Sequence, residues 1–492
     1  MTTTTLEPSF EKKESSPIGK DTHKLYIELD DSLLATNTFL ESLLLLLKKN
    51  PFSIFQILIW TFRGFRHVHQ EIAKKVHLDA SNLPFRQNVI GYLREEATQG
   101  RDLVLITGWN LDIAHAVSTH LKLFSQVVLR SDLQYLSHRR HQQTTETRFD
   151  PNGLEHITPG QSERQNFEAA QTVTLVQSHD QLLHTTPKYG SIKVFYQGKT
   201  PTFSLILKAL RVHQWVKNIL LFFPVATAHH LFHFEQLFQA SLAFVAFSFC
   251  ASGLYIFNDL LDLPADRRHP KKQSRPFASG ALSIKMGLWL QPVLLCFAFS
   301  ISLLALPPLF SLLLGGYAIT TVIYSTYLKK IAILDVLTLA GFYTVRIIAG
   351  GAAVSVPISA WLLAFSIFFF LSLAFGKRYA EIRLRKVENF QGIERRAYVG
   401  ADKEILATMG TISGYMSVLV LALYINSPEV STIYANPNFL WFICPLLLYW
   451  VSRTWLLAHR GSLDDDPLMI ALKDPSSYAV GAGAVILAVL AI

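Results

Sequence analysis

Three aspartates, Asp259, Asp262 and Asp266, lie close together in the stretch FNDLLDLPADRRHPKKQSRP (257–276). Their spacings of three and four residues place them on one face of a helix, where like charges repel one another. One interpretation is a solvated helix end that is stabilised by ion pairs with the bases that follow. These bases are Arg267, Arg268, Lys271, Lys272 and Arg275.

The position of these acids favours a second interpretation. They follow the apolar run LFQASLAFVAFSFCASGLYI and begin in the last turn of a predicted membrane span, where a carboxylate without a partner is costly. Pro264 removes a backbone donor, so we expect a kink or a new helix there. Carboxylate oxygens suit Mg²⁺, which is often shared with substrate phosphates, and basic side chains bind the phosphates directly. The stretch therefore predicts a magnesium–diphosphate site at the membrane surface.

The composition indicates a membrane protein. Half of the 492 residues are hydrophobic and only 16% are charged, which for so long a chain points to several membrane spans. The three cysteines, Cys250, Cys296 and Cys444, all lie within apolar runs. Neither a disulfide framework nor a zinc site can be built from them.

Apolar segments of near-spanning length recur after residue 200 and predict an all-α membrane bundle of about nine transmembrane helices. The first segment carries Lys217 and the last one is short. The segments are 216–232, 236–258, 286–306, 309–328, 333–353, 358–376, 406–425, 439–458 and 479–492.

Basic residues mark alternate connections between these segments. The second, fourth, sixth and eighth connections contain lysine or arginine, and the first, third, fifth and seventh contain neither. By the positive-inside rule the basic connections face the cytosol, together with the N-terminal region. We therefore expect a multi-pass protein of the cytoplasmic (inner) membrane. This topology largely explains the net charge of +9, so we expect no nucleic-acid partner.

The chain before the first span has a different character. Residues 1–24 are polar and are expected to be disordered. Residues 25–134 predict a small soluble α/β domain, because the strand patterns KLYIELD and DLVLITG are each followed by a helical pattern. Residues 135–200 are rich in His, Gln, Thr and Ser and are interpreted as mostly loop or linker. The transmembrane domain is then 201–492.

The stretch NDLLDLPADRRHPKKQSRP resembles the first aspartate-rich motif of the UbiA superfamily of intramembrane prenyltransferases, whose plan has nine helices. The segments RVHQWVKN, YSTYLKKIAILD, RIIAGG and LAFGKRYAEIR resemble the branch of decaprenyl-phosphate phosphoribosyltransferases. That resemblance implies a reaction that joins the anomeric carbon of phosphoribosyl pyrophosphate to a polyprenyl phosphate and releases pyrophosphate. Many prenyl-diphosphate enzymes of the superfamily have a second aspartate-rich motif in the sixth connection. GKRYAEIRLRK offers one glutamate and several bases there, which favours the phosphoribosyl branch.

The resemblance implies a role for each site residue. Asp259, Asp262 and Asp266 would bind Mg²⁺ and act in catalysis, with Asn258 beside them and Glu381 as an acid on the opposing connection. Arg346, inside the fifth span, is interpreted either as a phosphate ligand or as a residue that holds the helix bundle together. The remaining substrate-binding residues would be Lys217, Asn218, Lys271, Arg275, Lys329, Lys377 and Arg378.

The N-terminal region has a resemblance of its own. YIELDDSLLATNTFLESLL and VLITGWN resemble the first two motifs of the haloacid dehalogenase superfamily of phosphohydrolases. The nucleophile position holds Glu28 in place of aspartate, whereas Asp30 and Thr107 are retained. No glycine–aspartate metal motif is evident between 133 and 200. One added methylene displaces the attacking oxygen by more than about an ångström, so we expect an inactive domain.

Two other functions are considered. The first is a UbiA-type prenyltransferase that moves a polyprenyl chain from its diphosphate to an aromatic or quinone-precursor acceptor. The second is a transporter or scaffold that keeps an inactive form of the fold. A transporter lacks support because no broken-helix repeat is evident, and the intact acidic motif argues against an inactive relic.

Overall fold

In the computed structural model the chain forms two compact units. The first unit consists of Met1–Ser42 and Gln56–Thr200, and the second consists of Leu43–Phe55 and Pro201–Ile492. The predicted disordered N-terminus lies outside the described residues except for residue 24. The residues that the structure describes are 24–130, 155–158, 172–177, 191–197, 203–228, 232–387, 398–428, 430, 434–462 and 474–492.

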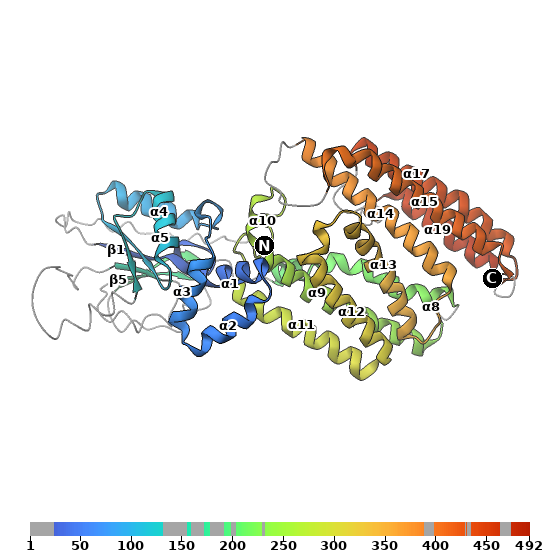
Figure 1. Cartoon of the computed structure of the whole chain (residues 1–492), viewed down its shortest axis with the longest axis horizontal. Helices are drawn as coiled ribbons and strands as arrows, with labels where there is room; N and C mark the ends of the chain where they lie inside the picture. Colours follow the sequence, from blue (N-terminus) through green and yellow to red (C-terminus); the bar gives the residue numbers. More distant parts are fainter. Residues whose placement is uncertain are drawn as a thin grey trace, which may run out of the picture. The chain divides into compact units, whose positions relative to one another are not determined.

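The first unit contains a six-stranded sheet in the order β3-β2-β1-β4-β5-β6, and all its strand pairs are parallel. LYIE in β1 and LVLIT in β2 are buried along their whole length, as strands covered on both faces of a parallel sheet are. The α/β prediction for this region is confirmed (Figure 1). The strands are β1 Leu25–Glu28, β2 Leu103–Thr107, β3 Gln126–Leu129, β4 Glu155–Thr158, β5 Thr172–Gln177 and β6 Ser191–Gln197.

Strands β4, β5 and β6 lie within 135–200, whose polar composition predicts mostly loop or linker. That interpretation was wrong for these three segments. Each strand is short and stands between polar stretches, so its alternation of apolar residues, as in TVTLVQ, is weak beside the surrounding composition. Segment β4 is a strand in the structure because it pairs in parallel with the buried strand β1.

Helices connect the strands of the first unit, and one of them, α1 (Thr38–Lys49), is shared by the two units. The division between the units falls inside α1, after Ser42. α4 and α5 lie beside the sheet (Figure 1), and Asn110 caps α5 by accepting hydrogen bonds from the backbone N–H groups of Asp112 and Ile113. The helices are α2 Ser53–Phe62, α3 Phe65–Lys75, α4 Gln87–Thr98 and α5 Leu111–Leu121, with the short turns η1 Leu29–Leu33 and η2 Ala80–Asn82.

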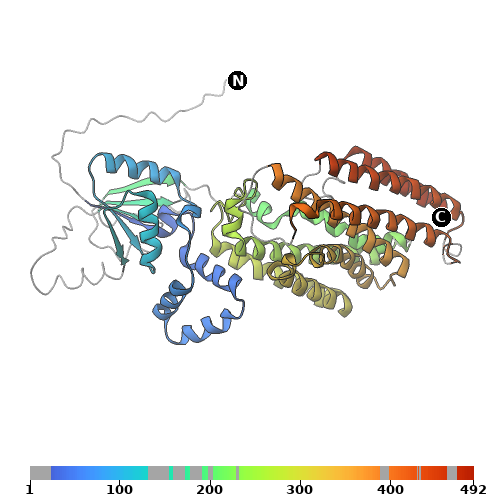
Figure 2. The ribbon, with the colours of Figure 1, turned by 45° about the horizontal axis from the view of Figure 1, so that its top comes forward.

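The second unit is a helix bundle (Figure 2), as predicted. Within the described part of the chain, seven helices are long and apolar enough to cross a membrane. α15 lies beside α17, and α17 lies beside α19 (Figure 1). The seven helices are α9 Phe234–Leu261, α11 Ile284–Ala305, α12 Pro308–Thr326, α13 Leu334–Ala353, α14 Ala360–Val387, α15 Lys403–Ile425 and α17 Ile443–Arg460.

Two of the nine predicted spans are shorter in the structure. The first, 216–232, falls on the 3₁₀ helix η6 (Val212–Phe222) and the short α8 (Phe223–Thr227). The last falls on α19 (Pro475–Ala491), an apolar helix of 17 residues. A count of nine membrane crossings therefore stays a prediction, while the described residues form a bundle with seven helices of membrane-spanning length.

Small residues in α9 and α13 allow close packing around the predicted site. Ala243, Ala246 and Cys250 on α9 are fully buried in the main core cluster. A Cβ atom at Gly350 of α13 would lie only 2.2 Å from the carbonyl oxygen of Leu221 in η6. Only glycine fits at this contact, which holds η6 against α13 and fixes the residues that η6 carries.

The aspartate-rich stretch forms a helix end and a new helix. α9 ends at Leu261, and α10 (Leu263–Arg268) starts after Asp262 with Pro264 in its first turn. The predicted break at this proline is confirmed. The remaining elements of the unit are α7 Phe203–Leu210, η7 Leu328–Lys330, η8 Gly400–Asp402 and η9 Pro437–Phe442.

Candidate active site

Asp259 and Asp266 converge on a single cation. Arg275 Nη1 lies 3.0 Å from Asp259 Oδ1 and 2.6 Å from Asp266 Oδ2. Arg211, which precedes η6, also donates to Asp259 Oδ1 through Nη2. Both carboxylates are buried, with 3% and 4% of their surface exposed. Burial of two acids at this position is compatible with the fold because arginines neutralise them.

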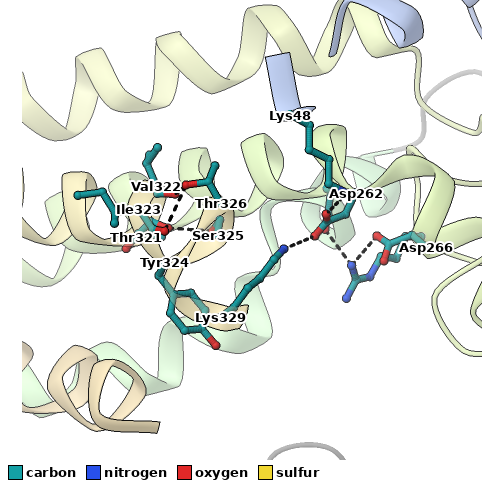
Figure 3. A network of polar contacts seen from close by, with 12 residues as sticks. Lys48, Asp262, Asp266, Thr321, Val322, Ile323, Tyr324, Ser325, Thr326 and Lys329 are labelled. Carbon is teal, nitrogen blue, oxygen red and sulfur yellow. Dashed lines mark hydrogen bonds and ion pairs between the residues drawn. The ribbon is translucent and has the colours of Figure 1, made fainter. Parts of the chain in front are cut away.

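Asp262 has a different set of partners. Lys48 Nζ of α1 lies 2.7 Å from Asp262 Oδ1, and Lys329 Nζ of η7 lies 3.3 Å from Asp262 Oδ2. Figure 3 shows the two lysines reaching this carboxylate from different elements. Burial favours a higher pKa for the Asp262 carboxyl, but Lys329 and Lys48 outweigh it and lower the pKa below its usual value. Asp262 is therefore ionised at neutral pH.

The residues fit a magnesium ion in part. Asp259 and Asp266 direct oxygens at one positive charge, and the buried Asn258 Oδ1 has no hydrogen-bond partner among the described residues. Mg²⁺ usually takes one or two carboxylates and completes its shell with water and phosphate oxygens. The described residues include no group of three or more His, Cys, Asp or Glu side chains that could hold a metal ion, so Asp262 does not join the other two aspartates as a ready-made ligand.

Lys217 and Asn218 of η6 and Arg346 of α13 form a second buried group, in which Lys217 and Arg346 both lie near the ring of Tyr343. Asn218 Oδ1 accepts a hydrogen bond of 2.8 Å from Arg346 Nε. The Arg346 guanidinium also donates to Tyr317 Oη at 3.3 Å and to the carbonyl of Phe342. It lies 4.9 Å from the centre of the Phe247 ring. These contacts are those of a residue that holds helices together, and a phosphate contact for Arg346 stays a prediction.

Arg378 belongs to a third network. Its Nε donates to Asp335 Oδ2 at 2.6 Å, its Nη1 to Glu381 Oε2 at 2.7 Å and its Nη2 to Tyr324 Oη at 2.8 Å. Tyr398 Oη donates to the other Asp335 oxygen at 2.8 Å. Arg378 is only 2% exposed. Its guanidinium, which was predicted to bind phosphate, is instead occupied by Asp335, Glu381 and Tyr324.

The two other predicted phosphate ligands are more accessible. Lys271 is exposed in the connection after α10, and Lys377 is half-buried on α14 beside Arg378. The structure thus brings Asp259, Asp266 and Arg275 together and joins Asp262 to Lys329. It places Lys217 with Asn218 and Arg346, and Glu381 with Arg378, in two further groups.

Sequence reasoning missed several partners of the acids. Arg211 stands at the start of the quoted motif RVHQWVKN, which was the available signal, but no role was assigned to it. Asp335 ends the quoted motif YSTYLKKIAILD, but no role was predicted for it. Lys48 had no signal as a site residue, because it lies 214 residues from Asp262 in the chain. Tyr324 opens the quoted motif YSTYLKKIAILD but was given no role, and Tyr398 carried no signal.

The N-terminal unit has its own group of polar residues at the carboxyl ends of β1 and β2. Glu28 is buried and forms an ion pair of 2.5 Å with Arg130. Asp30 Oδ1 accepts a hydrogen bond of 2.6 Å from the backbone N–H of Thr38. Burial raises the pKa of the Asp30 carboxyl to about 6. Thr107 is buried, and its hydroxyl has no hydrogen-bond partner among the described residues.

Comparison with known proteins places the chain in a family. The model of the "UbiA prenyltransferase family" matches residues 219–471. The chain is 30% identical to "Uncharacterized protein y4nM" of Sinorhizobium fredii, over 93% of this chain and 89% of that protein. Because so little of the chain is left out, that likeness extends over both units.

Two further relatives match a smaller share of the chain. "Nodulation protein NoeC" of Azorhizobium caulinodans is 36% identical, over 57% of this chain and 91% of the relative. "Decaprenyl-phosphate phosphoribosyltransferase" of Mycobacterium tuberculosis is 31% identical, over 55% of this chain and 88% of the relative. The helix bundle, the matched residues and these relatives agree, and the chain belongs to the UbiA prenyltransferase family.

Proposed function

We propose that the protein transfers phosphoribose from phosphoribosyl pyrophosphate to a polyprenyl phosphate at the cytosolic face of the inner membrane. In this reaction the bond between the anomeric carbon and the diphosphate breaks, and its electron pair leaves with pyrophosphate. A phosphate oxygen of the lipid forms the new bond to the anomeric carbon.

The observation that carries the proposal is the convergence of Asp259 and Asp266 on Arg275 at the end of α9. Arg211 adds further positive charge at Asp259, and Lys329 adds positive charge at the neighbouring Asp262. Such a group suits a donor with several phosphate charges, because oxygen ligands can hold Mg²⁺ and the bases can hold phosphate oxygens. When bound, Mg²⁺ would stabilise the charge on the departing pyrophosphate.

The protein side chains would bind and orient the donor. Asp259 and Asp266, with Asn258, would hold the metal, and Arg275 would turn from the carboxylates to a phosphate. Because Arg275 is 27% exposed in its side chain, it has room to make this change. The similarity to decaprenyl-phosphate phosphoribosyltransferases supports this donor over a prenyl diphosphate.

Labelled donor provides the direct test. Membranes that contain the protein are incubated with Mg²⁺, polyprenyl phosphate and phosphoribosyl pyrophosphate labelled in the ribose, and the lipid phase is counted. We expect label in the lipid with the wild-type chain and background counts with Asp259→Asn. Transfer of a labelled prenyl chain to an aromatic acceptor, without any ribose label in the lipid, would instead show a prenyltransferase.

The haloacid dehalogenase-like unit is proposed to have no phosphatase activity. A glutamate occupies the nucleophile position, and Arg130 neutralises it at 2.5 Å. A nucleophile must be free to approach a phosphorus atom, and an ion pair with arginine competes with that approach. We propose a structural or regulatory role for this unit.

A further inference from the structure

Lys48 approaches the aspartate-rich stretch from the N-terminal part of the chain. It stands in the last turn of α1, in the segment Leu43–Phe55, which belongs to the same compact unit as Pro201–Ile492. Its Nζ lies 2.7 Å from Asp262 Oδ1 (Figure 3). A residue from a region that resembles a phosphohydrolase therefore contacts a candidate residue of the transferase site.

The ion pair between Lys48 and Asp262 is partly accessible to solvent. The side chain of Lys48 is 30% exposed and that of Asp262 is 28% exposed. Lys329 binds the other oxygen of the same carboxylate, so two ammonium groups share Asp262. Both ammonium groups are drawn to one carboxylate, and a phosphate oxygen within reach of Lys48 would add a second favourable charge interaction for this lysine.

The chemistry of an ammonium group allows Lys48 to bind that anion without leaving Asp262. A lysine has three N–H donors and no acceptor. The hydrogen bond to Asp262 uses one of them. The others can point to phosphate oxygens, for which lysine is a common point-charge ligand. Among the described contacts, Asp259 and Asp266 pair with Arg211 and Arg275, whereas Lys48 pairs with Asp262.

We propose that Lys48 is a substrate-binding residue of the transferase, which Asp262 positions to hold a phosphate of the donor. The inference rests on the proposed function and adds to it a ligand from outside the UbiA-like domain. In this arrangement Asp262 orients Lys48 and Lys329, while Asp259 and Asp266 remain for the metal. Lys48 is then a donor-affinity residue and takes no part in the chemical step.

The test uses the full-length protein in detergent or lipid nanodiscs. Binding of phosphoribosyl pyrophosphate is measured by calorimetry in excess Mg²⁺ for the wild-type chain and for Lys48→Gln, Lys48→Arg and Lys49→Gln. Lys49 is the adjacent, exposed lysine of the same helix and gives a matched control for charge. Binding of Mn²⁺ alone, followed by electron paramagnetic resonance, reports the metal site independently of the donor and of activity.

We expect Lys48→Gln to weaken donor binding about tenfold, which corresponds to about 1.4 kcal/mol. Lys48→Arg should recover most of this loss, and Lys49→Gln should bind as the wild type does. Mn²⁺ alone should bind Lys48→Gln at least as tightly as the wild type, because a nearby positive charge has been removed. In turnover, KM for the donor should rise while kcat stays within about twofold.

Two results would overturn the inference. Unchanged donor binding in a folded Lys48→Gln protein would show that the ion pair is structural only. Tighter donor binding or faster turnover in that variant would show that Lys48 blocks the site. A wild-type protein that fails to bind phosphoribosyl pyrophosphate would instead refute the proposed function. An equal melting temperature for the variant and the wild type confirms that folding is not the cause of any change.

Discussion

Arg378 and Asp335 form a buried ion pair between α13 and α14, with 2.6 Å between Arg378 Nε and Asp335 Oδ2. The two side chains are 2% and 0% exposed. Tyr398 completes the group, since its hydroxyl donates to Asp335 and accepts from the backbone N–H of Ile333. Burial raises the pKa of Tyr398, so its hydroxyl remains a donor at neutral pH. The network fixes the start of α13 relative to α14.

Removal of Asp335 should destabilise the membrane unit strongly. Asp335→Ala leaves Arg378 buried beside Glu381, which is then its remaining acidic partner among the described contacts. Loss of one partner of a buried pair costs about 3–5 kcal/mol. We expect a clear fall in the melting temperature of the protein in detergent. Glu404→Ala, at an exposed position on α15, is the control and should melt as the wild type does. An unchanged midpoint for Asp335→Ala would contradict a stabilising role for the pair.

Impermeant labelling should show opposite faces for alternate connections. After the three native cysteines are replaced, single cysteines are introduced at Asn436, between α15 and α17, and at Gln273, between α10 and α11. Both positions are exposed. We expect Asn436→Cys to react from outside intact cells and Gln273→Cys to react only after the membrane is opened. Reaction of both from the outside would refute the cytosolic placement of the basic connections.

The sequence was sufficient for the elements that depend on local pattern. The apolar segments predicted the membrane helices, and Pro264 predicted the break between α9 and α10. The buried strands β1 and β2 followed from short apolar runs. These features depend on residues that are neighbours in the chain, so spacing and composition can reveal them.

The partners of the charged residues could not be obtained in this way. Arg346 contacts Asn218 across 128 residues, and Arg378 contacts Asp335 across 43. Such pairs form only when helices pack, and any buried acid could pair with several bases by charge alone. The sequence could therefore list the acids and bases of the candidate site without showing which of them meet.

Stability of the N-terminal unit should depend on the charge of Asp30. Its carboxyl has a folded-state pKa of about 6, above the ordinary value of 3.8, because burial disfavours the charged form. Between these values the folded state binds more protons than the unfolded state, so stability falls as the pH rises from about 4 to about 6. Asp30→Asn keeps an acceptor for the Thr38 N–H and should flatten this dependence.

Hydrogen exchange of the β1 and β2 amides, corrected for intrinsic rates, measures this effect in the full-length chain. The wild-type amides should be better protected at pH 4.5 than at pH 6.5, and Asp30→Asn should show a smaller difference. Asp112→Asn, at an exposed position on α5, is the control and should behave as the wild type does. Equal slopes for the wild type and Asp30→Asn would mean that Asp30 is not the titrating group.

The N-terminal unit should not hydrolyse phosphate esters. Full-length protein with Asp259→Asn, which removes transferase activity in our proposal, is incubated with Mg²⁺ and sugar phosphates or phospholipids. We expect no release of phosphate above background, because Glu28 is paired with Arg130. Magnesium-dependent release that is abolished by Asp30→Asn would show an active phosphohydrolase.

The repulsion among Asp259, Asp262 and Asp266 is offset by bases in this structure, and we predict that bound metal and donor take over that role during catalysis. Asp259→Asn should lower transfer at least about 100-fold, because even the loss of an outer-shell partner of a metal costs about 10–100-fold. The variant should fold, since Arg211 and Arg275 are 22% and 27% exposed and can turn toward water. Arg275→Ala should raise KM for the donor more than it lowers kcat, and Arg275→Lys should recover part of the loss. Near-normal transfer by a folded Asp259→Asn protein would refute the site.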